Sequence, residues 1–177
     1  LTAALGNPEP GTGAGAGTGS SAATAAAAQE SGPAVADGPT VLYLVRHGET
    51  APDGTRNPPL SEEGRERARW LGVVLSHARL DAVYTTDYRR TRATARGAAL
   101  ANGVQLTVYD PTDLDALAGE LRARGGRLLV VGHSNTTPAL ARALGGDPGS
   151  PIREDEFDRL YVLVIRDDST RTVRLRY

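Results

Sequence analysis

The chain of 177 residues contains no cysteine, no methionine and no lysine, and only 5% of its residues are aromatic. The lack of cysteine excludes disulfides, thiolate nucleophiles and zinc–thiolate sites. The lack of lysine excludes Schiff-base chemistry and the lysine of a P-loop. All 20 cationic residues are arginine, and alanine, glycine and proline are abundant. The coding bias of a GC-rich genome explains this composition better than a function does.

The chain also lacks an excess of charge and a long apolar run. The formal net charge is −1, so we expect no nucleic-acid partner and no basic membrane-binding patch. No stretch of 18 apolar residues occurs, so we expect no membrane span. The three histidines, His47, His77 and His133, do not have the spacing of a metal motif, and we expect neither a metal ion nor another cofactor. His77 lies near the end of an expected helix, where a solvated position is the simplest interpretation.

Residues 1–38 form a region of low complexity. Glycine alternates with threonine or alanine over Gly11–Gly19, and Ser20–Ala28 is mostly alanine. Large apolar residues are almost absent, so burial cannot offset the entropy lost on ordering, and we expect a disordered tether. Two locations are consistent with such a start: export or tethering to the envelope through this segment, or the cytoplasm. The sequence leaves the oligomeric state open.

Residues 39–177 are expected to form one domain in which strands and helices alternate. The expected strands are 41–45, 81–85, 104–109, 127–131, 159–166 and 170–176, and the expected helices are 62–77, 88–101, 111–124 and 136–144. Ser61 is suited to cap the first helix, and Asn102-Gly103 to end the second. Repeated strand–helix alternation predicts an α/β fold, a three-layer αβα sandwich with a mainly parallel sheet, and the last two strands predict a hairpin.

Two of the expected strands are each followed by a histidine. His47 follows the expected strand 41–45 after Arg46, and His133 follows the expected strand 127–131 after Gly132. Open α/β sheets bind ligands at the carboxyl ends of their parallel strands, so the two rings can face each other across one crevice. A lone histidine is more often a core or turn residue, but the pair, with arginines between them in sequence, favours a shared anion site.

Arginines complete the expected site. Arg46 follows the first strand, and Arg89, Arg90 and Arg92 lie where an expected helix begins, in directions that allow one or two of them to reach an anion. Donors from several directions suit a phosphoryl group better than a carboxylate. Nearby arginines disfavour a protonated imidazole, so a neutral, nucleophilic histidine is expected. An acid to protonate the leaving oxygen is also needed.

These residues resemble the histidine phosphatase superfamily, which includes cofactor-dependent phosphoglycerate mutases and small phosphohistidine phosphatases. The resemblance extends over about Thr40–Ile165. It rests on four motifs: Leu44–Thr50 (LVRHGET), Pro59–Gly64 (PLSEEG), Thr85–Ala95 and Val131-Gly132-His133. It implies a phosphoglycerate mutase-like fold and a phosphohistidine intermediate on His47. Arg46, Arg90 and His133 would hold the phosphate, and Arg90 is selected among the three helix arginines by the register of the third motif.

The chain departs from the family pattern in three places. The loop after Thr50 is short and lacks the tryptophan–asparagine pair of the mutases. The usual glutamate acid has no clear counterpart, and Asp110 is the candidate, with a helix cap ahead of Pro111 as the alternative. Serine follows His133, where the acid phosphatase and phytase branch carries aspartate. Asn135 is a further candidate for substrate binding.

The resulting hypothesis is a metal-independent enzyme, a histidine phosphatase that hydrolyses a phosphomonoester or phosphoramidate. Its partner would be a phosphorylated small molecule or a phosphoprotein. Phosphoglycerate mutase-type phosphotransfer is one alternative, and a non-catalytic phosphate-binding module is the other. The physiological substrate does not follow from the sequence.

Overall fold

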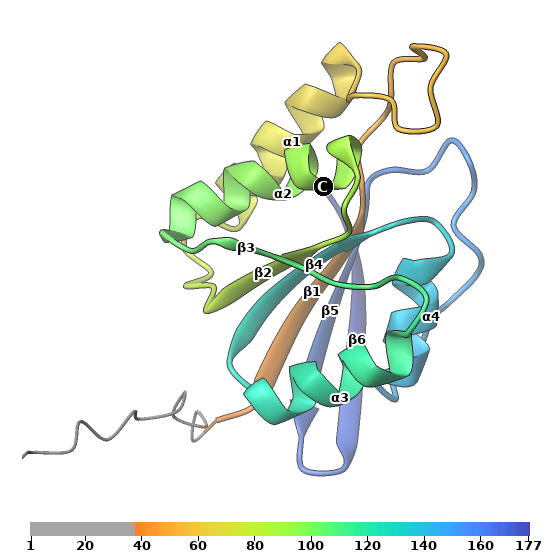
Figure 1. Ribbon diagram of the computed structural model, residues 1–177. Helices are drawn as coiled ribbons and strands as arrows, with labels where there is room; N and C mark the ends of the chain where they lie inside the picture. The colour runs from red at the N-terminus through yellow and green to blue at the C-terminus, as the bar shows by residue number, and fades with distance from the viewer. Residues whose placement is uncertain (1–37) are drawn as a thin grey trace, which may run out of the picture. The chain divides into compact units, whose positions relative to one another are not determined.

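The computed structural model describes residues 38–177 (Figure 1). The predicted tether lies outside the described residues, apart from Gly38, and stays a prediction. The strands are β1 (Thr40–Arg46), β2 (Ala82–Thr85), β3 (Leu106–Val108), β4 (Arg127–Gly132), β5 (Arg159–Arg166) and β6 (Ser169–Arg176). The helices are α1 (Glu62–Val74), α2 (Arg89–Asn102), α3 (Leu114–Arg124) and α4 (Thr136–Ala143).

The strands form one six-stranded sheet in the order β3-β2-β4-β1-β5-β6. The pairings among β3, β2, β4 and β1 are parallel, whereas β5 pairs antiparallel with both β1 and β6. The sheet is therefore mixed, with its parallel part where the expected strand–helix units lie. The predicted hairpin of the last two strands is confirmed.

Helices cover the sheet on both faces, as the α/β prediction requires (Figure 1). One apolar core joins α3 and α4 to the sheet through residues such as Leu121, Leu140 and Leu44. The other joins α1 and α2 to the opposite face through residues such as Leu71, Ala98 and Val131. Because neighbouring residues of a strand point to opposite faces, Leu44 and Val45 of β1 belong to different cores. The three-layer prediction is confirmed.

The helix ends follow local capping chemistry. Ser61 Oγ accepts a hydrogen bond from the Gly64 backbone N–H, as predicted, and Gly103 ends α2 with a φ of 68°. Helix α1 ends at Val74, before the predicted 77, where the chain tightens into turns. Helix α3 begins at Leu114 because Asp113 provides its cap.

Within residues 38–177, no helix is both long enough and apolar enough to cross a membrane.

Candidate active site

The two histidines meet at the carboxyl edge of the parallel strands. Strands β1 and β4 are paired in parallel with Arg46 opposite Gly132, and the His47 backbone N–H donates to the Gly132 carbonyl oxygen at 3.0 Å. The ring centroids of His47 and His133 lie 5.3 Å apart, with the ring planes at 70°. The structure thus brings the two imidazole rings together, as their positions after the ends of two parallel strands predict.

Close backbone packing fixes the turn that carries His47. A Cβ atom on Gly48 would lie 2.9 Å from the Gly64 carbonyl oxygen, and one on Gly64 would lie 2.1 Å from the Glu49 carbonyl oxygen. Only glycine permits this approach between the turn and the start of α1. The Gly48 backbone N–H also donates to Thr94 Oγ1 of α2 at 3.0 Å. His47 is therefore held from both neighbouring helices.

One nitrogen of the His47 ring has a defined role. Nδ1 lies 2.8 Å from the Gly48 carbonyl oxygen. Since a carbonyl only accepts, Nδ1 carries the proton of the neutral ring and donates it, and Nε2 keeps its lone pair. Burial lowers the pKa of His47 to about 3, and the nearby charges of Arg90 and Arg46 act in the same direction. The residue is 8% exposed, and at neutral pH its ring is neutral, with the lone pair of Nε2 free.

His133 is held by a chain of threonine hydroxyl groups. Its Nε2 lies 3.0 Å from Thr86 Oγ1, which in turn lies 2.9 Å from Thr91 Oγ1. The Thr91 hydroxyl donates to the carbonyl oxygens of Thr86 and Tyr88. Burial lowers the pKa of His133 to about 4, and the positive charges of Arg90 and Arg46 add to this effect. His133 is therefore also neutral in the unliganded site.

The three arginines at the start of α2 have different surroundings. Arg89 pairs with Asp53 at 3.2 Å and Arg92 pairs with Asp87 at 2.8 Å, and both side chains are exposed. Arg90 has no carboxylate partner within residues 38–177; its guanidinium lies 4.4 Å from the centroid of the Tyr88 ring and borders the same cavity as the two histidines. Of the three, the structure turns Arg90 to the site, and the other two are surface charges.

Arg46 is held by the loop that leads into β5. Its Nη1 donates to the carbonyl oxygens of Arg153, Glu154 and Glu156, each at 2.9 Å. The Arg46 guanidinium lies 3.9 Å from the centroid of the Phe157 ring, and this ring lies 6.2 Å from the His47 ring. Burial lowers the pKa of Arg46, although arginine stays charged. Arg46 and Arg90 therefore place two positive charges near His47.

A cavity of about 440 Å³ opens at this edge of the sheet. Its wall consists of His47, Tyr88, Arg90, Pro111, Thr112, His133, Ser134, Asn135 and Thr136. Asn135, a predicted binding residue, precedes the first turn of α4, and its side chain makes no capping bond there. The N-terminus of α4 thus adds partial positive charge to the cavity. The arrangement suits a tetrahedral oxyanion.

Asp110 does not have the properties that a general acid needs. It is exposed, and its Oδ1 accepts hydrogen bonds from the Thr112 backbone N–H at 2.8 Å and from the Thr112 hydroxyl at 2.7 Å. These bonds lower the pKa of Asp110, whereas a proton donor needs a raised one. The alternative as a helix cap is wrong, because Asp113 caps α3. Among the described residues that form the cavity wall, none carries a carboxylate.

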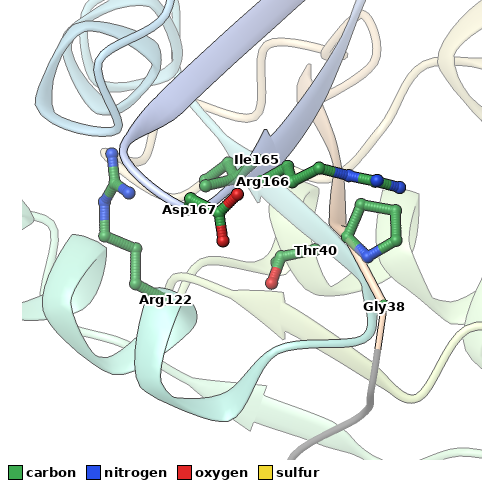
Figure 2. A pocket seen from close by; sticks show the side chains of 7 residues that line it. Gly38, Thr40, Arg122, Ile165, Arg166 and Asp167 are labelled. Carbon is green, nitrogen blue, oxygen red and sulfur yellow. The ribbon is translucent and has the colours of Figure 1, made fainter.

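A second cavity, of about 430 Å³, lies at the opposite end of the strands, where β1 begins and β5 ends (Figure 2). Arg122, Arg166 and Asp167 give it polar walls, but its seven lining residues include no histidine. The two cavities have similar volumes, but they differ in the chemistry of their walls. The candidate active site is therefore the cavity at His47 and His133.

Several residues near the site were not predicted from the sequence. Thr86 and Tyr88 lie within the arginine-rich stretch, and their position just after β2 is the signal that could have identified them. Thr112 follows β3 in the same way. Phe157 had no signal, because it lies in an irregular loop between α4 and β5 whose path does not follow from hydrophobic periodicity. His77 is exposed beyond the end of α1 and takes no part in the site.

Comparison with known families agrees with this arrangement. The family model of the histidine phosphatase superfamily (branch 1) matches residues 42–112. These residues include β1 from Leu42 onward, the turn at His47 and the start of α2 with Arg90.

Individual relatives match parts of the chain. The adenosylcobalamin/alpha-ribazole phosphatase of Salmonella typhimurium is 41% identical over 61 residues, which is 31% of this chain and 30% of that protein. A probable phosphoglycerate mutase of Serratia proteamaculans is 35% identical over 89 residues, 47% of this chain and 41% of that protein. The chain thus spans less than half the length of these curated relatives.

A solved structure extends the likeness over most of the described fold. A protein of Nakamurella multipartitia, provisionally assigned as the phosphohistidine phosphatase SixA, superimposes with a TM-score of 0.54 and 25% identity. The superposition covers 72% of this chain and 85% of that protein. The likeness therefore extends beyond the segment that the family model matches.

Proposed function

This chain belongs to the histidine phosphatase superfamily, and we propose that it is a metal-independent phosphatase that works through a phosphohistidine on His47. The observation that carries the proposal is the state of the His47 ring. Its Nδ1–H is bound by the Gly48 carbonyl oxygen, its Nε2 is unprotonated, and it lies beside His133 in the wall of a cationic cavity. A neutral imidazole with one fixed nitrogen is prepared for attack on phosphorus.

In the first step, the lone pair of His47 Nε2 forms a bond to phosphorus, and the bond from phosphorus to the leaving group breaks. Negative charge on the phosphoryl oxygens is met by Arg46, Arg90, His133 and the N-terminus of α4. Such prearranged donors act mainly by positioning and by neutralising charge, as phosphoryl transfer requires.

In the second step, water attacks the phosphohistidine. The bond between His47 Nε2 and phosphorus breaks, inorganic phosphate leaves, and the neutral ring is restored. The Gly48 carbonyl keeps its hydrogen bond to Nδ1–H throughout. This contact stabilises positive charge on the phosphorylated ring and keeps its orientation.

The composition of the cavity wall favours a class of leaving group. Since no carboxylate borders the cavity among residues 38–177, a leaving group that needs a proton from a strong side-chain acid reacts slowly. A phosphoramidate such as phosphohistidine releases an imidazole nitrogen, and an aryl phosphate releases a stabilised phenolate. Among phosphomonoesters and phosphoramidates, we therefore place phosphoramidates and activated esters ahead of alkyl phosphates.

The test is turnover of 4-nitrophenyl phosphate in the presence of a metal chelator. The wild-type protein should release 4-nitrophenolate and phosphate, and His47→Asn should lower kcat by at least about a thousandfold, because the nucleophile is lost. His77→Asn is the matched control, since His77 is exposed and distant from the site. Full activity in His47→Asn would overturn the proposal.

The second candidate is phosphoglycerate mutase-type phosphotransfer, favoured by the likeness to the Serratia protein. The short loop between His47 and α1 argues against it, because little chain is present to enclose a doubly phosphorylated intermediate. Isomerisation of phosphoglycerate faster than phosphate release would support the mutase. Tight binding of tungstate without turnover of any substrate would support a phosphate-binding module.

A further inference from the structure

The guanidinium of Arg46 is held on one side by main-chain atoms only. Three carbonyl oxygens of the loop 153–156 surround Nη1, although this nitrogen carries two hydrogens. At least one of these bonds is therefore shared, and the loop provides more acceptors than Nη1 can fully use. Main-chain acceptors carry no formal charge, so they fix the arginine without neutralising it.

The other nitrogens of the guanidinium make no hydrogen bond within residues 38–177. Arg46 Nε is buried and has no hydrogen-bond partner among the described residues. A buried donor without an acceptor is costly, and such donors are commonly satisfied when a ligand binds. The Nε and Nη2 side of a guanidinium is a fork that matches two oxygens of a phosphate. Because Nη1 is occupied by the loop, this fork is the part of Arg46 that can meet an anion.

Phe157 sets the plane of this fork. Its ring centroid lies 3.9 Å from Arg46 Cζ, within the range of a cation–π contact, and 6.2 Å from the His47 ring centroid. The ring thus lies against both the arginine and the nucleophile. It is half-buried and outside the two apolar cores, so core packing does not account for its position.

The loop that carries Phe157 has its own anchor. Arg159, at the start of β5, donates to both carboxylate oxygens of Glu156 at 2.6 and 2.8 Å and to the Ser150 carbonyl oxygen at 2.6 Å. The side chains of Arg159 and Glu156 are each 9% exposed. Breaking a buried pair of this kind is strongly destabilising. The loop is therefore a rigid support for Arg46.

We propose that Phe157 is a positioning residue: together with the carbonyls of loop 153–156, it holds Arg46 so that Nε and Nη2 form the second arginine fork of the phosphate site. This inference rests on the proposed function, because it takes the anion at His47 to be a phosphoryl group. Phe157 acts through Arg46 and does not touch the reacting atoms.

The test is a double-mutant cycle read out by the Kd of tungstate, a phosphate mimic, measured by calorimetry. Phe157→Leu should weaken tungstate binding about fivefold, in the range expected for loss of a cation–π contact. Phe157→Tyr, which keeps an aromatic ring, should leave the Kd of tungstate within twofold of wild type. In the Arg46→Ala background, Phe157→Leu should change the Kd by less than twofold, because the group that it positions is gone. With 4-nitrophenyl phosphate, Phe157→Leu should raise KM more than it lowers kcat.

Tyr43→Leu is the matched control, since it removes an aromatic ring from β1 on the side of the α1–α2 core, away from Arg46. It should leave the Kd within twofold of wild type. Equal effects of Phe157→Leu in both backgrounds, or wild-type binding in Phe157→Leu alone, would overturn the role of Phe157 and leave the phosphatase proposal standing. If Arg46→Ala itself bound tungstate as the wild type does, the anion site proposed here would fail, and the role of Phe157 with it. Unfolding midpoints within a few degrees of wild type establish that each variant is folded.

Discussion

The two sides of the cavity are built differently. On the anion side, His47 and His133 follow the ends of paired parallel strands, and Arg90 lies in the first turn of a helix. The remaining part of the wall, which we take as the side of the leaving group, includes Pro111 and Thr112 from the loop between β3 and α3. The anion side carries charge and fixed donors, whereas the other side carries only small polar and apolar groups.

The comparison teaches which part of a phosphoryl-transfer site depends on the fold. Donors for the phosphoryl group need fixed positions, and strand ends and helix N-termini provide them. The leaving group varies between substrates, and loops can change without disturbing the sheet. The open side without a carboxylate is therefore where this chain is expected to differ in specificity from relatives that share its anion side.

The largest expected effect concerns the leaving group. Without a carboxyl acid at the cavity, kcat/KM should fall by about 10²–10⁴ from 4-nitrophenyl phosphate to an alkyl phosphate, the usual contribution of a general acid. Phosphoramidate should be hydrolysed at a rate nearer that of the aryl ester. Rates across a series of substituted phenyl phosphates measure this dependence. Equal rates for aryl and alkyl esters would show that an acid reaches the cavity and that the two sides are not as different as we describe.

A smaller effect is expected from the anion side. Arg90→Ala should lower kcat/KM for 4-nitrophenyl phosphate about a hundredfold, because a charged donor without a carboxylate partner is lost. Arg89→Ala removes a neighbouring charge that is already paired with Asp53, and it should change kcat/KM by less than threefold. Similar losses in both variants would mean that general positive charge, and not the placement of Arg90, determines binding.

The buried histidine should make stability depend on pH. The pKa of His47 is about 3 in the folded protein against 6.5 as its ordinary value, so below pH 6.5 the unfolded chain binds a proton that the native state does not. Stability is then lost as pH falls from 6.5 towards 3. Between pH 7 and pH 5 the wild type should lose about 2 kcal/mol more unfolding free energy than His47→Asn. Urea unfolding at the two pH values measures the difference, and equal losses would contradict a buried neutral ring.

The smallest effect is expected at Asp110. Its carboxylate is exposed and bound to Thr112, so Asp110→Asn should change kcat for 4-nitrophenyl phosphate and for an alkyl phosphate by less than twofold. A selective loss of at least tenfold with the alkyl ester would identify Asp110 as an acid that moves into the cavity. That result would restore the sequence-based candidate.

The sequence predicted the parts of the molecule that hydrophobic periodicity determines. Apolar runs located the strands, and the residues directly after β1 and β4 were therefore placed at one sheet edge. The register of a motif selected Arg90. Its neighbours Arg89 and Arg92 each form an ion pair with an aspartate at the surface. Strand β3 is shorter than expected, Leu106–Val108 against 104–109, because it is an edge strand that pairs only with the four residues of β2.

Contacts made by loops were not predictable. The Asp110 side chain accepts from the Thr112 backbone N–H and so competes with the helix for a backbone donor. The resulting turn moves the start of α3 to Leu114. The contact of Phe157 with Arg46 joins residues 111 positions apart through a loop without periodic pattern. Likewise, Asn57 Oδ1 accepts from the Arg89 backbone N–H at 2.9 Å, so the first donor of α2, which the sequence left free for an anion, is already used.

The covalent intermediate is the most direct test of the account. The protein is mixed with 4-nitrophenyl phosphate and quenched with alkali within milliseconds, and peptides are analysed by mass spectrometry for an added phosphoryl group. The account predicts a phosphoryl group on His47 that is stable to alkali and lost in acid, with none on His133. Rapid product release with no phosphoryl group on His47, or its appearance on His133, would contradict it.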